Sequence, residues 1–238
     1  MPAWRLLALV VNALAVALLC GIASAKATRH SVSAARLFCG SSVHGDFDGD
    51  GRRDVALVGS VRKDCRARWT VTVHLASGPV ATRRLDHDIL QELESSRLCL
   101  VGCTAFAAHD LNRDGRDELE VADNTPATGD AVVVYRLLHG SLRPLKLRTR
   151  TGAFKLMLLS YNGSATGGAW VVCRDRPQAK RRVIQVGEDY PTPSNHHVEI
   201  SETAYILSGV LFRRLSTRTY RLRSGRIGEA TAVRGRRC

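Results

Sequence analysis

Apolar and polar residues alternate with a period of two along much of this chain. Trp69, Val71 and Val73, for example, are each followed by a polar residue. This alternation is typical of a β-strand with one buried face. Strands are predicted at 54–61, 69–76, 98–107, 118–122, 131–138, 156–160, 169–173, 182–186, 198–207 and 210–222.

Helical periodicity is scarce by comparison. The best helical stretch is 86–95, where Ile89, Leu90 and Leu93 fall on one side among acidic residues. Clusters rich in Gly, Asn, Asp, Ser and Pro separate the predicted strands, as such clusters do in turns. The pattern therefore predicts a single all-β domain built from antiparallel sheets.

The amino terminus has a different pattern. Arg5 precedes an almost continuous apolar run at 6–22, and the small residues Ala-Ser-Ala follow at 23–25. A basic start, an apolar centre and an Ala-x-Ala exit are typical of a secretory signal peptide. An uncleaved membrane anchor is the alternative, because about 20 apolar residues span a bilayer. We expect residues 1–25 to be removed, leaving a secreted, extracellular domain at 26–238.

The cysteines agree with export. Six remain after removal of the signal peptide, and an even number in an oxidising compartment indicates up to three disulfides. The sequence leaves their pairing open. A Cys39–Cys65 bond would enclose the first acidic loop described below, and Cys99 could join Cys103 only across a turn. A Cys173–Cys238 bond would tie down the last residue.

The most informative feature is an acidic loop that occurs twice. Residues 46–54 read DFDGDGRRD and residues 110–118 read DLNRDGRDE, so the loops agree in residue type at positions one, three, five, six and nine. They begin 110 − 46 = 64 residues apart. Calcium takes six to eight oxygen ligands, and acids at alternate positions around a Gly turn can surround one ion. The sequence therefore predicts two Ca²⁺ sites.

The ligands of each site follow from position in the loop. In the first loop we expect the side chains of Asp46, Asp48, Asp50 and Asp54 and the carbonyl of Arg52. In the second we expect the side chains of Asp110, Asn112, Asp114 and Glu118 and the carbonyl of Arg116. An EF-hand needs a Glu at position twelve, where this chain has Leu57 or Val121, so EF-hand and dockerin-type helix pairs are excluded. An ordinary Asp- and Gly-rich turn is the alternative.

These loops and their flanks resemble the calcium hairpins of the FG-GAP or VCBS repeats, which occur in integrin α-chain propellers and many secreted bacterial proteins. The resemblance covers about 37–123 and includes His44-Gly45 before the first loop and His109 before the second. It implies a calcium loop between strands of each propeller blade. The 238 − 25 = 213 mature residues hold about three repeats of 64 residues, whereas complete propellers have four to eight blades. A partial β-propeller-like fold is expected, with a β-sandwich as the alternative.

Charge suggests one kind of partner. The formal net charge is +13, and basic residues are densest from Arg213 to Arg237, where Glu229 is the only acid. Such a segment would attract anionic extracellular polymers and offer forked donors to phosphate oxygens. A solvated basic surface is the alternative.

The chain lacks the common catalytic motifs Gly-x-Ser-x-Gly, Ser-x-x-Lys and His-Glu-x-x-His. The sequence thus predicts a non-enzymatic, secreted calcium-binding repeat protein that acts as an extracellular or cell-surface binding or adhesion module. A secreted hydrolase with an unrecognised active site is the alternative.

Overall fold

The computed structural model describes residues 37–63, 69–85, 103–123, 130–164, 167–176, 179–189, 197–223 and 238. All of them belong to one compact unit at 36–238. The predicted signal peptide and the helix predicted at 86–95 lie outside the described residues. The residues that are described form strands and no helix, and the sheets are almost entirely antiparallel, which confirms the predicted all-β class.

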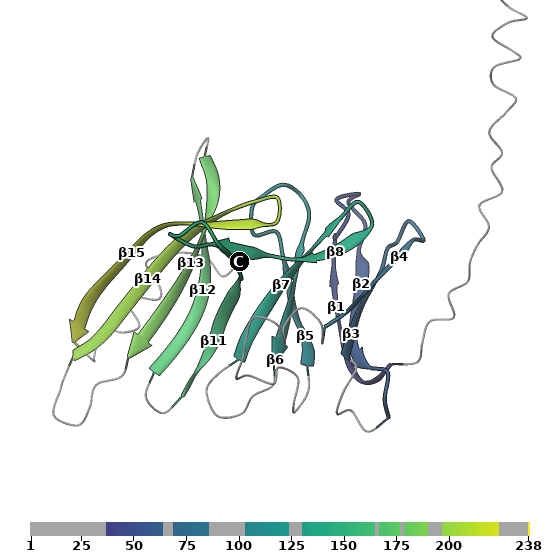
Figure 1. Cartoon of the computed structure of the whole chain (residues 1–238), viewed down its shortest axis with the longest axis horizontal. Helices are drawn as coiled ribbons and strands as arrows, with labels where there is room; N and C mark the ends of the chain where they lie inside the picture. Colours follow the sequence, from purple (N-terminus) through teal and green to yellow (C-terminus); the bar gives the residue numbers. More distant parts are fainter. Residues whose placement is uncertain are drawn as a thin grey trace, which may run out of the picture. The chain divides into compact units, whose positions relative to one another are not determined.

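The first sheet is a four-stranded antiparallel meander (Figure 1). Its strands are β1 (Phe38–Gly45), β2 (Asp54–Ser60), β3 (Trp69–His74) and β4 (Val80–Arg84), in that spatial order. The first acidic loop connects β1 to β2. Gly40 lets β1 lie close to β2, because a Cβ at this position would come within 2.8 Å of the Val58 carbonyl oxygen.

A second meander repeats this arrangement. It consists of β5 (Cys103–His109), β6 (Glu118–Asp123), β7 (Asp130–Leu138) and β8 (Ser141–Pro144), each antiparallel to the next. The second acidic loop connects β5 to β6, as the first connects β1 to β2. The two loops therefore occupy equivalent hairpins.

A third meander comprises β12 (Gly167–Arg176), β13 (Ala179–Asp189), β14 (His197–Ser208) and β15 (Leu211–Arg223). Strand β11 (Leu158–Ser164) pairs with both β7 and β12, so the second and third meanders share one sheet. The short strands β9 (Lys146–Arg148) and β10 (Phe154–Leu156) extend it beyond β15, to eleven strands in all. This sheet curls into a half-barrel.

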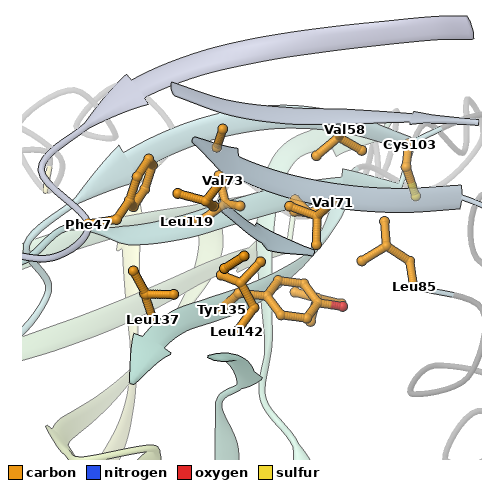
Figure 2. Close-up of a cluster of buried hydrophobic side chains, with 14 of the residues drawn as sticks. Phe47, Val58, Val71, Val73, Leu85, Cys103, Leu119, Tyr135, Leu137 and Leu142 are labelled. Atoms are coloured by element: carbon orange, nitrogen blue, oxygen red, sulfur yellow. The ribbon is translucent and has the colours of Figure 1, made fainter. Parts of the chain in front are cut away.

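The core lies in layers on both sides of the second meander. One cluster packs Val58, Val71 and Val73 of the first sheet against Leu119 and other residues on one face of the second meander (Figure 2). A second cluster packs the opposite face of that meander against the third. It includes Val132, Val134, Val171, Val183 and Phe212. Strand β6 is consequently buried on both faces, which places Glu118 and Glu120 in the interior.

Most strand positions agree with the hydrophobic alternation, but five strands were not predicted. Strands β1, β4, β8, β9 and β10 are short or lack a regular apolar face. β1, with the sequence FCGSSVHG, is an example, since its outer residues are partly exposed and it is held by pairing with β2. Such strands depend on a partner more than on their own composition.

The bond between Cys173 and Cys238, one of the pairings that the sequence left open, is present, with Cα atoms 4.8 Å apart. It attaches the last residue to β12, where Cys173 is part of the second core cluster. Cys39 and Cys103 are also disulfide-bonded. Their suggested partners, Cys65 and Cys99, lie outside the described residues.

Candidate metal centre

The first acidic loop is organised around the carboxylate of Asp46. Its Oδ1 accepts hydrogen bonds from the amides of Gly49 (2.7 Å) and Asp50 (3.1 Å), and its Oδ2 accepts one from Gly51 (2.8 Å). Three amides thus converge on one side chain and curl the loop tightly. The turn brings carboxylate oxygens of Asp46, Asp48 and Asp50 within 4.8 Å of one another.

The second loop repeats this turn. The Asp110 carboxylate accepts the amides of Asp114 (3.1 Å) and Gly115 (2.9 Å). Positive φ angles occur at the same two positions in both loops. At position six these are +81° at Gly51 and +82° at Gly115, and at position four they are +79° at Gly49 and +63° at Arg113. Glycine adopts this conformation without a steric penalty, so the repeated glycine at position six reflects a backbone requirement.

Position nine anchors each loop to the interior. One oxygen of Asp54 accepts the Phe47 amide at 2.8 Å, and one oxygen of Glu118 accepts the Leu111 amide at 2.8 Å. Both carboxylates are buried. The other oxygen of Asp54 accepts the amide of Ala76 at 2.8 Å. The predicted ligands at position nine therefore also fix the loop backbone.

The residue at position two of each loop is apolar and connects the loop to the core. Phe47 is buried in the first core cluster, where Figure 2 shows its ring among the core side chains, and Leu111 is buried in the second cluster. Phe47 is flanked by the acids Asp46 and Asp48, and Leu111 is flanked by Asp110 and Asn112. The loops therefore couple an exposed acidic face to the packing between meanders.

The electrostatic surroundings of the two loops differ. In the first, the exposed Arg52 donates from Nε to Asp50 Oδ2 at 2.9 Å, and this hydrogen bond lowers the pKa of Asp50. Ser77 adds a hydroxyl contact to Asp48 Oδ2 at 3.3 Å. In the second loop, burial raises the pKa of Glu118 to about 8. The Arg136 guanidinium lies beside that carboxyl and opposes the shift.

The structure brings Asp46, Asp48 and Asp50 together as a group able to hold a metal ion. No comparable group of three acids was found around the second loop among the described residues. In both loops the backbone N–H at position seven donates to the carboxylate at position five. The distance is 2.8 Å from Arg52 to Asp50 and 3.2 Å from Arg116 to Asp114. Three oxygen donors from carboxylates suit a hard cation such as calcium.

Two residues important for the site were not found by sequence reasoning. Arg136 contacts Asp114 from β7 and is buried. Asp117, at position eight of the second loop, accepts the Asp46 amide of the first loop at 2.8 Å. The sequence does contain a signal for Arg136, because it follows Val132 and Val134 at alternate positions and so lies on the same buried face of the strand. A charged side chain buried on that face requires a partner.

The predicted basic segment is described as far as Arg223. On β15, Arg213, Arg214, Arg218 and Arg221 have exposed side chains. Two of them face acids across the β14–β15 pair: Arg218 contacts Glu202, and Arg221 lies 3.5 Å from Glu199. Part of the basic charge is therefore balanced within the hairpin, and polymer binding stays a prediction.

Comparison with known proteins identifies no relative. No family model, curated protein or solved structure matches this chain. The likeness to FG-GAP or VCBS repeats therefore rests on the residues of the two loops. Among the described residues, no helix is long and apolar enough to cross a membrane.

Proposed function

We propose that this chain is an exported calcium-binding protein in which the first acidic loop holds a structural Ca²⁺ ion. The observation that carries the proposal is the convergence of Asp46, Asp48 and Asp50 within 4.8 Å on a glycine-turned loop. Three carboxylates so close together repel one another unless a cation is present. Calcium favours such flexible oxygen ligands, and magnesium gives up its water less readily.

The bound ion would stabilise more than the loop itself. Because Phe47 lies between two of the acids and is buried in the first core cluster, an ion that fixes the loop also fixes this contact. The ion is therefore proposed to brace the β1–β2 hairpin against the second meander. We further propose a non-enzymatic role as an extracellular binding or adhesion module.

The finer architecture belongs to the same proposal. Three four-stranded antiparallel meanders, two of which carry the same loop in the same hairpin, support a partial β-propeller-like arrangement. Strand β11, which joins two meanders into one sheet, departs from separate blades. Export is supported by the Cys173–Cys238 disulfide, since such bonds persist in oxidising compartments.

The test is thermal unfolding of the mature, disulfide-bonded protein in chelator, in Ca²⁺ and in Mg²⁺. Calcium is expected to raise Tm more than magnesium does. At a hundredfold excess over Kd, one site adds about 2.7 kcal/mol to the free energy of unfolding. Asp50→Asn should lose this increase. Glu199→Gln, which removes a half-exposed carboxylate far along the chain in β14, is the matched control and should keep it.

Two outcomes would contradict the proposal. One is a Tm that responds equally to calcium and magnesium. The other is an Asp50→Asn protein that responds to calcium as the wild type does. The first result would mean that the loop has no preference for calcium, and the second would leave Asp50 without a role in binding it.

A further inference from the structure

The side chain of Arg136 reaches the second acidic loop from the neighbouring strand. Arg136 lies on β7 and is 4% exposed. Its Nη2 donates to Asp114 Oδ2, its Nη1 donates to the Gly209 carbonyl at 3.1 Å, and its Nε lies 3.5 Å from Glu118 Oε1. The guanidinium is thus placed between two of the acids that were predicted to bind the second calcium ion.

We infer that the guanidinium of Arg136 is the resident cation of the second loop and takes the place of a metal ion, so that the chain binds calcium at the first loop alone. This inference rests on the proposed function of the first loop. It assigns Arg136 as the residue that sets the number of calcium ions per chain.

Strand register identifies the residue of the first meander that is equivalent to Arg136. Val55 pairs with His74 in the first meander, and Leu119, 64 residues further on, pairs with Tyr135 in the second. The residue after His74 is Leu75, and the residue after Tyr135 is Arg136. The first loop therefore has a neutral, half-buried leucine where the second has a buried cation.

The predicted ligands also make the first loop more negatively charged than the second. The first loop has four carboxylates at the predicted ligand positions, whereas the second has three, because Asn112 replaces an acid at position three. With Arg136 included, the formal charges are −4 for the first loop and −3 + 1 = −2 for the second. Counted in this way, with every carboxyl group taken as ionised, the second loop is less negative than the first.

Burial explains why calcium would not displace Arg136. Arg136 and Glu118 are buried, whereas Asp114 is partly exposed. A calcium ion that took both carboxylates would leave the buried guanidinium as an uncompensated charge in a medium of low dielectric constant, which is strongly unfavourable. Arg52 in the first loop is different, because its side chain is 58% exposed and it contacts Asp50 from the surface. An exposed pair of this kind is weak and can exchange with a metal ion at little cost.

The number of bound ions tests the inference. Equilibrium dialysis of the mature, disulfide-bonded protein against radioactive Ca²⁺ is expected to give one ion per chain, and none for Asp50→Asn. Two ions per wild-type chain would overturn the inference while leaving the proposed function intact. No bound ion in the wild type would instead overturn the proposed function, so the two failures are distinguishable.

Exchanging the residues between loops tests the role of Arg136 itself. Arg136→Met combined with Asn112→Asp should restore the charge pattern of the first loop and allow a second ion to bind. A folded double variant, judged by far-ultraviolet circular dichroism, that still takes up one ion would overturn the assignment to Arg136. Leu75→Arg should lower the calcium affinity of the first loop at least tenfold, and an unchanged affinity would count against the inference even where the double variant fails to fold.

Discussion

Asp46 and Asp117 form a reciprocal hydrogen-bonded pair that joins the two acidic loops. The Asp117 amide donates to the Asp46 carbonyl at 2.7 Å, and the Asp46 amide donates to Asp117 Oδ2 at 2.8 Å. Gly45 is suited to this contact, because a Cβ there would lie 2.8 Å from Asp117 Oδ2. The pair fixes the first loop against the hairpin of the second meander.

The side chain of Asp117 should therefore contribute to stability. Asp117→Ala is expected to lower the free energy of unfolding by about 1–3 kcal/mol, because the half-buried Asp46 amide loses its acceptor. Asp117→Asn keeps an acceptor oxygen and should lose clearly less. Urea unfolding in chelator measures both values. Equal stability of Asp117→Ala and the wild type would contradict this account of the loop contact.

Asp54 should act as a structural anchor whether or not calcium is present. Its two oxygens accept the amides of Phe47 and Ala76, and the side chain is 1% exposed. Asp54→Ala leaves both amides without this partner and should cost about 2–4 kcal/mol in chelator. The measurement is urea unfolding with chelator and again with Ca²⁺. A loss seen only with Ca²⁺ would show that Asp54 acts through the ion alone.

Glu118 should make stability decrease with rising pH. Its pKa in the folded state is raised from 4.5 to about 8, so folding binds a proton between these values. Its contribution to stability is full below about pH 4.5 and declines as pH rises towards 8, by at most about 1.4 kcal/mol per pH unit. Glu118→Gln retains an acceptor for the Leu111 amide and should remove this slope.

The comparison for Glu118 is made on calcium-free protein by urea unfolding at several pH values between 5 and 8. Other titrating groups contribute equally to both proteins, so the difference between wild type and variant isolates Glu118. A difference that does not change with pH would mean that the pKa of Glu118 is the same in the folded and unfolded protein.

The Cys173–Cys238 disulfide should account for a large part of the stability of the third meander. The two cysteines are 65 residues apart, and closing a loop of this length in the unfolded chain corresponds to about 4 kcal/mol by the chain-entropy estimate. Cys238→Ser should lower Tm accordingly. The control is Ser216→Ala, an exposed serine in the same meander. An equal Tm for Cys238→Ser and wild type would contradict the prediction.

Local features of this protein were accessible from sequence. Strand alternation, the glycine at position six and the spacing of Asp46, Asp48 and Asp50 depend on residues a few positions apart. A period of two and a tight turn are encoded in such short segments, so the all-β class and the acidic cluster could be predicted. The Cys173–Cys238 bond could be suggested, although not chosen among the possible pairings.

Only the tertiary structure decided which acids of the two loops have other partners. Asp117 is 71 residues from Asp46, and Arg136 lies on a different strand from Asp114. Their contacts arise because the second meander packs on both faces, which buries Glu118 and directs the Arg136 guanidinium into the second loop. Sequence spacing gives both loops the same turn, but the charge that meets each loop depends on how the meanders pack.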